Sequence, residues 1–170
     1  MCSYAPGMAA DPIDPTAGAP TNEPVLVRQA GVADLDRLAP LFDRYRQFQG
    51  QAGDVPAARA FLRARFDHGE SIVFLAHDGY RALGFAQLYP SFSSVSLARV
   101  FLLNDLFVDE AGRRRGIATR LLAAVEDCAK ALDGKRVTLF VARPNTSAQA
   151  LYESRGWTRD EQFFVYHRYP

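Results

Sequence analysis

Three consecutive arginines, Arg113, Arg114 and Arg115, stand directly before a segment with the pattern of a helix start. A helix N-terminus carries roughly half a positive elementary charge, so cations are unfavourable there unless an anion lies between them and the backbone. Gly112 and Gly116 lie in the same turn, and glycines let the backbone approach a ligand closely. Because the N–H groups of a first helical turn point outward together, the segment predicts a phosphate-binding loop.

The spacing Arg113-x-x-Gly116-x-Ala118 differs from the common phosphate-binding motifs. The segment lacks the Lys-Ser or Lys-Thr pair that ends a P-loop, and it lacks the G-x-G-x-x-G of dinucleotide-binding folds. A solvated basic helix start is the alternative. If an anion is the partner of the arginines, we expect that replacing one with alanine leaves the stability of the ligand-free protein unchanged or slightly higher.

A second segment, residues 145–157, repeats chemically useful residues at helical spacing. Asn145, Ala148, Tyr152 and Gly156 follow one another at intervals of three, four and four residues. Asn145 is a good helix cap, Ala148 and Tyr152 share a face, and Gly156 suits a left-handed helix exit. Packing in the core is the alternative role for Tyr152.

The elements that must position these residues alternate between strand and helix patterns. Apolar residues three and four apart indicate helices, and short apolar runs bounded by turn residues indicate strands. The pattern predicts a mixed α/β fold, with a mostly antiparallel central sheet and helices on both faces, in the order β-α-α-β-β-β-α-β-α-β. The expected elements are strand 25–30, helix 33–49, a helix capped by Asp54, strands 71–76, 82–89 and 99–108, helix 117–132, strand 136–142, helix 145–156 and strand 163–169.

Composition bounds the class of protein. The chain has 170 residues, 48% of them apolar, and a net charge of +1. We expect a disordered tail over 1–24 and one domain over 25–170. The charge argues against a nucleic-acid partner, and the lack of a long apolar run argues against a membrane partner. Only Cys2 and Cys128 and three scattered histidines offer soft ligands, so we expect no metal and a cytoplasmic location.

Together these segments resemble the GNAT superfamily of N-acetyltransferases, and among its members the small-amine and polyamine acetyltransferases most of all. The resemblance spans residues 25–168. It implies acetyl-CoA as the cosubstrate, so the anion expected by the arginines is the pyrophosphate of the coenzyme. The motifs that carry it are Leu103–Val108, Arg113-x-x-Gly116-x-Ala118 and Asn145-x-x-Ala148-x-x-x-Tyr152-x-x-x-Gly156-Trp157.

The resemblance also implies a role for individual residues. Tyr152 would be the general acid for the leaving thiolate. Asn145 would contact the pantetheine arm or the thioester end. The residues expected to hold acetyl-CoA are Leu106, Phe107 and Val108 along the arm, Arg113, Arg114, Arg115, Gly116, Ile117, Ala118 and Thr119 at the pyrophosphate, and Asn145 and Tyr152.

The identity of the general base is left open, with Asn104 and Asp105 as the two catalytic candidates. Polyamine acetyltransferases have a glutamate where this chain has Asn104, and an amide cannot accept the proton. Asp105 follows directly, but strand alternation predicts that it points to the opposite face.

The acceptor is expected between the first two helices and the loop before the fourth strand. Tyr45, Phe48, Tyr89 and Phe92 would form aromatic walls, and Asp105 would hold a cationic amine. Packing in the core or in a homodimer is the alternative role for these aromatic residues. We expect acetyl transfer to a small primary amine by direct attack in a ternary complex. The alternatives are a protein lysine or N-terminal acetyltransferase and a non-catalytic CoA-binding module.

Overall fold

The computed structural model describes residues 24–79 and 81–170. These residues form two compact units, 24–139 and 140–170, which are described one at a time. The expected tail, residues 1–24, lies outside the described residues except for Pro24.

The first unit is built on one five-stranded sheet whose strands lie in chain order. The first four strands pair antiparallel with one another, and the fifth runs parallel to the fourth. This arrangement confirms the mixed, mostly antiparallel sheet that the sequence predicts. The strands are β1 (Leu26–Gln29), β2 (Ile72–Asp78), β3 (Arg81–Ser93), β4 (Ala98–Val108) and β5 (Arg136–Leu139).

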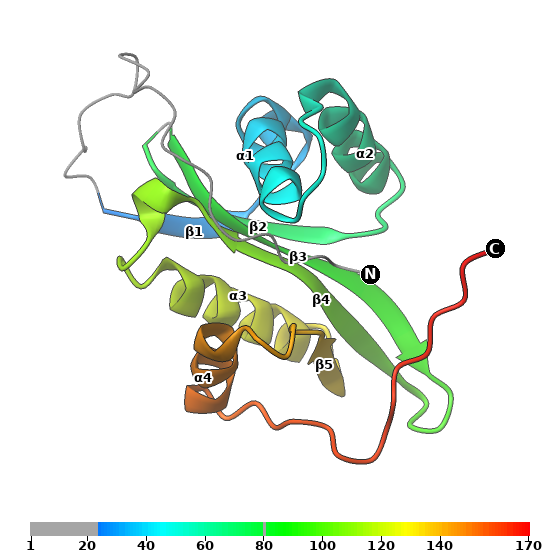
Figure 1. The fold of residues 1–170 in the computed structure, drawn as a ribbon. Coiled ribbons are helices and arrows are strands. Elements are labelled where there is room, and N and C mark those ends of the chain that lie inside the picture. The colour runs from blue at the N-terminus through cyan, green and yellow to red at the C-terminus, as the bar shows by residue number, and fades with distance from the viewer. Residues whose placement is uncertain (1–23, 80) are drawn as a thin grey trace. The chain divides into compact units, whose positions relative to one another are not determined.

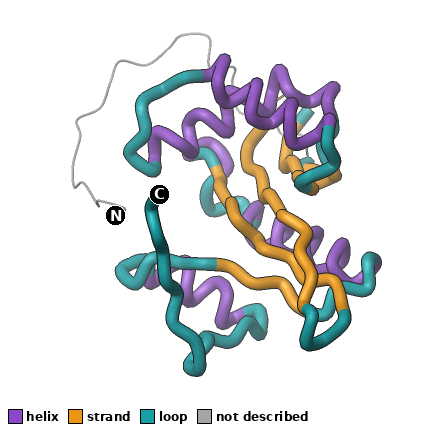
Figure 2. The backbone as a smooth tube through the Cα atoms, turned by 90° about the vertical axis from the view of Figure 1, so that its right-hand side faces the viewer, coloured by secondary structure: helices purple, strands orange, loops and turns teal. Residues whose placement is uncertain are grey.

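Helices cover both faces of this sheet. The helices α1 (Leu35–Phe48) and α2 (Val55–Asp67) lie on one face, and α3 (Ile117–Ala131) lies on the other (Figure 1). Figure 2 shows the strands twisting between these helical layers. Asp54 caps α2 as expected, because its carboxylate accepts a hydrogen bond of 2.9 Å from the N–H of Ala57.

Each face of the sheet packs its own layer of apolar side chains. On the α1 face, the ring of Phe85 lies 5.5 Å from that of Phe42 and 5.7 Å from that of Tyr45. On the other face, a Cβ at Gly84 would lie 3.2 Å from a methyl group of Ile117, so α3 packs almost directly on the backbone of β3. Phe85 and Gly84 are adjacent, so β3 sends successive residues to opposite helical layers, as a strand must.

One extra residue in β4 changes this alternation. Gln87 faces Asp105 across the β3–β4 ladder, whereas the next residue, Leu88, faces Leu103. Asn104 therefore has no partner in β3, which makes it the inserted residue of a β-bulge. Before the bulge, Phe101 lies against Gly134 in the turn that ends α3. After it, odd-numbered residues face α1 instead.

The second unit contains one helix, α4 (Thr146–Ser154). As expected, Asn145 caps it by accepting a 3.2 Å hydrogen bond from the N–H of Ala148, and Gly156 leaves it with a left-handed φ of 82°.

Two expectations for the C-terminal strands were wrong. The strand expected over 136–142 ends at Leu139, and the strand expected over 163–169 does not form in the described chain. The aromatic residues of that last segment are exposed, for example Phe164 at 83% and Tyr166 at 89%. Alternating aromatic residues favour a strand, but only a neighbouring strand can satisfy its backbone N–H and C=O groups.

Candidate active site

The loop between β4 and α3 begins with a single turn of 3-10 helix, Glu110–Gly112. Gly112 is buried there, and a Cβ on it would lie 2.9 Å from both the carbonyl oxygen of Leu83 and the Cδ1 of Ile117. The glycine is therefore required for close packing against β3. This corrects the expectation that Gly112 lets the backbone approach a ligand.

Gly116 has the opposite surroundings. It precedes α3 with a left-handed φ of 70°, and a Cβ on it would meet nothing within 4 Å. Arg114 also has a positive φ, 59°, which costs energy for a residue with a side chain. In the described structure no side chain caps α3, so the N–H groups of its first turn, Ile117 to Thr119, are available to an external acceptor.

The arginines of this loop have different partners. Arg115 forms an ion pair of 2.9 Å with Asp78 at the end of β2, and Asp78 is only 4% exposed. Arg113 lies 3.5 Å from Glu110, and both of these side chains are exposed. We therefore expect Arg115 to depart from the expectation that removing an arginine leaves the ligand-free protein equally stable, because its loss would leave a buried carboxylate without its cation.

The edge of β4 near this loop is open. The pairing of β4 with β5 runs only from Val100 to Leu103. Beyond Leu103, no strand in the described part of the chain pairs with this edge of β4. Backbone N–H and C=O groups of Leu106–Val108 can therefore pair with an extended ligand as they would with another strand.

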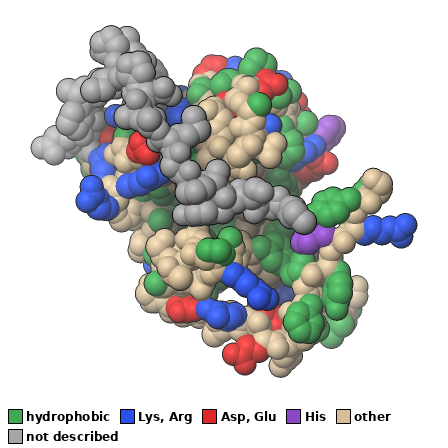
Figure 3. Space-filling model, viewed as in Figure 1, with side chains coloured by type: hydrophobic (Ala, Val, Ile, Leu, Met, Phe, Trp, Pro, Cys, Tyr) green, Lys and Arg blue, Asp and Glu red, His purple; other side chains and the backbone are tan. Residues whose placement is uncertain are grey.

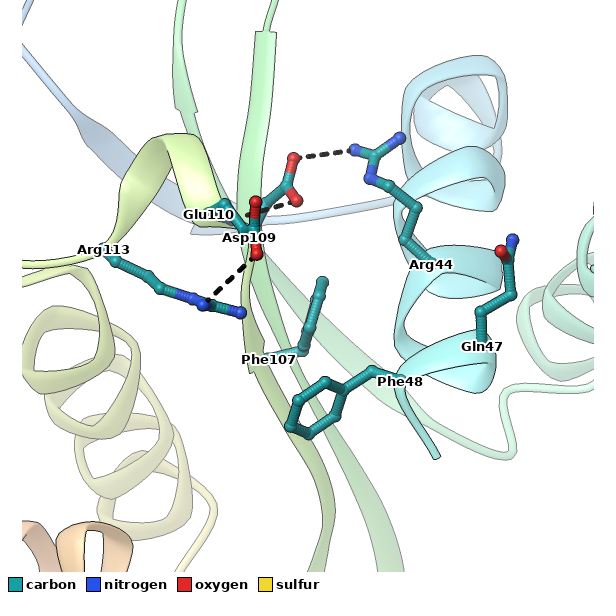
Figure 4. A pocket seen from close by; sticks show the side chains of 7 residues that line it. All are labelled: Arg44, Gln47, Phe48, Phe107, Asp109, Glu110 and Arg113. Carbon is teal, nitrogen blue, oxygen red and sulfur yellow. Dashed lines mark hydrogen bonds and ion pairs between the residues drawn. The ribbon is translucent and has the colours of Figure 1, made fainter. Parts of the chain in front are cut away.

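A pocket of about 250 Å³ lies between the C-terminal part of α1 and the end of β4 (Figure 4). Its apolar side is formed by Phe48 and Phe107, whose ring centroids are 6.1 Å apart. Its polar side carries the Arg113–Glu110 pair and a second pair of 3.1 Å between Arg44 and Asp109. The lining residues are Arg44, Gln47, Phe48, Phe107, Asp109, Glu110 and Arg113.

The bulge places a carboxylate on the α1 face. Asp105 is 5% exposed, and the amide nitrogen of Asn104 donates to both of its oxygens at 3.1 Å. Burial raises the pKa of Asp105 above its usual range, and hydrogen bonds from Asn104 and from the Tyr45 phenol partly offset that rise. The expectation that Asn104 and Asp105 point to opposite faces is therefore wrong, because a bulge interrupts the alternation.

The residues expected to form the aromatic walls divide into two groups. Tyr45 lies in the ring cluster of α1 and β3, and Tyr89 is half-buried two residues along β3 from Gln87, the ladder partner of Asp105. Burial, together with the charge of Asp105, raises the pKa of Tyr89 to about 12, so its phenol stays protonated near neutral pH. Phe48 and Phe92 are exposed, and the guanidinium of Arg99 lies 5.5 Å from the Phe92 ring centre.

In the second unit, the ring of Tyr152 lies 5.8 Å from that of Trp157 at a tilt of 45°. The Asn145 side-chain oxygen is occupied locally, because it accepts from Ser147 Oγ as well as from the helix backbone.

Sequence reasoning missed several buried polar residues of the first unit, and two of them, Asp78 and Gln87, contact or face residues of the candidate site. Asp78 is the partner of Arg115, and the two are 37 residues apart. Gln87 is fully buried opposite Asp105 and donates to Ser71 Oγ at 2.9 Å, while its Oε1 has no partner among the described residues. A glutamine inside the apolar run of residues 82–89 was the available signal, since a buried amide needs hydrogen-bond partners.

The bulged strand, its open edge and the uncapped start of α3 agree with one protein family. A model of the acetyltransferase (GNAT) family matches residues 35–157. The chain belongs to the GNAT family of acetyltransferases. It is therefore an acetyltransferase, and acetyl-CoA is the cosubstrate that this family uses.

Relatives of this GNAT chain carry the same description. It is 44% identical to the uncharacterized N-acetyltransferase YhfO of Bacillus subtilis strain 168, over 82% of this chain and 94% of that protein. It is 34% identical to a probable acetyltransferase of Haemophilus influenzae, over 73% and 84% of the two chains. A crystal structure of a probable acetyltransferase superposes with a TM-score of 0.81 at 40% identity, covering 85% of this chain and 97% of the other.

Other features of the GNAT chain bear on its partners. Within residues 24–79 and 81–170, no three His, Cys, Asp or Glu side chains gather as they would to hold a metal ion. None of the helices described is both long and apolar enough to cross a bilayer. On the face shown in Figure 3, basic and acidic side chains are interspersed outside the grey region.

Proposed function

We propose that the protein transfers the acetyl group of acetyl-CoA to the primary amine of a small molecule, by direct attack in a ternary complex. The observation that carries the proposal is Asp105, a buried carboxylate of raised pKa on the α1 face of β4. A general base works best when its pKa lies near the working pH, and burial moves an aspartate in that direction. Asp105 thus acts as the general base, a role that the chain cannot give to position 104 because Asn104 stands there instead of a glutamate.

The coenzyme binds along the open edge of β4 and across the start of α3. The pantetheine arm pairs with the backbone of Leu106–Val108. Its pyrophosphate accepts hydrogen bonds from the N–H groups of residues 113–119, where the helix dipole adds attraction. Arg113 releases Glu110 to reach the phosphate, at little cost because exposed ion pairs contribute about 0–1 kcal/mol.

The reaction then consists of one proton transfer before the amine attacks and a second proton transfer after it. Asp105 accepts a proton from the bound ammonium group, and the freed amine attacks the thioester carbonyl carbon. The tetrahedral intermediate breaks its C–S bond and expels the coenzyme thiolate, to which the phenol of Tyr152 donates a hydrogen bond. The nitrogen then loses its second proton to that thiolate, which leaves the amide and free CoA, and Asp105 returns its own proton to solvent. Full transfer of the phenolic proton is uphill by about 1.5 pKa units, because a phenol titrates near 10 and a thiol near 8.5. Tyr152 therefore acts mainly by stabilising the developing thiolate.

Two calorimetric variants test coenzyme binding. Gly116→Val places a branched side chain at a left-handed position, while Gly116→Asn keeps that conformation accessible. We expect acetyl-CoA to bind the wild-type protein and Gly116→Asn, and to bind Gly116→Val at least tenfold more weakly. Absence of binding heat with the wild-type protein at millimolar acetyl-CoA would refute the proposal.

Thiol release with a panel of amines tests the transfer step. Small primary amines should accelerate release of free CoA from acetyl-CoA. Release only with lysine-containing or N-terminal peptides would assign a protein substrate instead. Tight coenzyme binding without release on any amine would assign a non-catalytic CoA-binding module. Location in the cytoplasm and assembly as a homodimer are part of the same proposal, and the mass of the protein in solution tests the second.

A further inference from the structure

A second pocket, of about 510 Å³, lies on the face of the sheet that carries Asp105. Its residues come from the last turn of α2, from the loop that follows, and from β3: they are Arg65, Glu70, Tyr89 and Pro90. Tyr89 is two residues along β3 from Gln87, and Gln87 faces Asp105 in the ladder. Residues two apart share a face, so the pocket and Asp105 lie on the same side of the sheet.

Tyr89 connects the two ends of this region. Its phenol lies within electrostatic reach of Asp105 and of both charged residues of the pocket, Arg65 and Glu70. The region therefore has a carboxylate at the Asp105 end and, at the pocket end, a guanidinium that is ion-paired with Glu70. A molecule that spans it meets Asp105 at one end and the N–H donors of Arg65 at the other.

The guanidinium of Arg65 has a carboxylate and an aromatic ring as neighbours. Its Nε forms an ion pair of 2.5 Å with Glu70, and its central carbon lies 4.8 Å from the ring centre of Phe61. The closest contact of this ion pair runs through Nε and not through the two terminal nitrogens. A fixed guanidinium presents parallel N–H donors that match a carboxylate better than any other common group.

We propose that this pocket receives the far end of the acceptor and that Arg65 binds a carboxylate there. The acceptor is then a small amine that also carries a carboxylate, an amino acid or an amino-acid derivative. This inference rests on the proposed function and specifies its substrate. A diamine fits less well, because its second ammonium group can only donate hydrogen bonds, as the Arg65 guanidinium does, and the Glu70 carboxylate is already ion-paired with that arginine.

Matched acceptors measure the preference directly. Straight-chain amino acids of two to five carbons are compared with their primary amides and with diamines of equal length, and kcat/KM is followed by thiol release. We expect the carboxylates to be preferred by about tenfold or more, since a hydrogen bond to a charged group contributes about 1.5–3 kcal/mol. Arg65→Gln should lower the ratio of kcat/KM for carboxylate over amide by a similar factor. Arg65→Lys keeps the positive charge and loses the paired N–H donors of the guanidinium, so it should lower this ratio less.

Arg63→Gln is the matched control. Arg63 lies on the same helix, is exposed, and pairs with Asp67 instead of lining the pocket. This variant should keep the ratio within twofold, and thermal melts verify that all three variants fold. Equal or better use of diamines, with a ratio that Arg65→Gln leaves unchanged, would overturn the carboxylate assignment while acetyl transfer stands. No thiol release with any amine, together with no heat of acetyl-CoA binding, would instead refute the proposed function and this inference with it.

Discussion

Asn104 donates hydrogen bonds to both carboxylate oxygens of Asp105, at 3.1 Å each, although the two residues are neighbours in one strand. The bulge makes this geometry possible by removing the alternation between them. Burial disfavours the charged form of Asp105, and the Asn104 amide stabilises it. The pKa of the carboxylate is therefore set by burial on one side and by the hydrogen bonds from Asn104 and Tyr45 on the other, and a substitution at Asn104 removes one of these bonds.

Replacing Asn104 with alanine should move the acidic limb of the pH–rate profile to higher pH. The amide lowers the pKa of Asp105, so its removal raises that pKa further and the base is protonated over a wider range. A hydrogen bond to a charged group contributes about 1.5–3 kcal/mol, which corresponds to a shift of about one to two pH units. The profile of kcat/KM between pH 5 and 9 measures this shift. An unmoved limb would mean that Asp105 is not the titrating base.

Replacing Asp105 with asparagine should lower activity and raise stability. The turnover should fall by about 10²–10⁴, the usual contribution of a general base. The folded-state pKa of Asp105 lies above its unfolded value, so the protein is most stable below the unfolded pKa and loses stability as pH rises toward the folded one. Asparagine removes that loss, so the melting temperature at pH 7 should equal or exceed that of the wild-type protein. A lower melting temperature would show that the charged carboxylate stabilises the fold.

Replacing Arg115 with alanine should destabilise the ligand-free protein, while replacing Arg113 should not. Asp78 is buried and loses its cation in the first variant, at a cost of about 1–3 kcal/mol. Arg113 has only an exposed partner, so its loss should change stability by less than about 0.5 kcal/mol. Urea unfolding without ligand separates the two variants. Equal stability of both would show that the Asp78–Arg115 pair contributes nothing to the fold.

Replacing Tyr152 with phenylalanine should lower turnover more than it weakens acetyl-CoA binding. The substitution keeps the ring beside Trp157 and removes only the phenolic donor. The loss should be at the lower end of the usual 10²–10⁴-fold range for proton donation, because the phenol mainly donates a hydrogen bond. Steady-state kinetics and calorimetry measure the two effects separately. If turnover is unchanged at the pH optimum, the thiolate leaves without this donor.

Much of the fold could be predicted from local patterns. The stripe of Ile117, Leu121 and Val125 predicts α3 and its buried face, and all three residues are buried. The cap at Asp54 and the glycine exit at Gly156 are single-residue signals that the structure confirms. The strand expected over 163–169 failed because strand formation depends on a partner outside the segment.

The candidate site was less accessible to sequence reasoning. The arginines and Gly116 make the loop before α3 recognisable in the sequence. The contact between Arg115 and Asp78 cannot be predicted in the same way, because it joins residues far apart in the chain. The shared face of Asn104 and Asp105 was mispredicted, since a bulge depends on how two strands pair and leaves no mark in the alternation of one.

The bulge at Asn104 also reverses the usual effect of losing one residue from a strand. Deleting a residue from a regular strand turns every following side chain to the wrong face. In β4, the ladder on either side of Asn104 is already matched, with Leu103 opposite Leu88 and Asp105 opposite Gln87. A chain without Asn104 could continue the same ladder with Phe101 and Phe107 each still in its own layer. The sheet would thus tolerate the loss of this residue. The property that depends on Asn104 is the pKa of the Asp105 carboxylate.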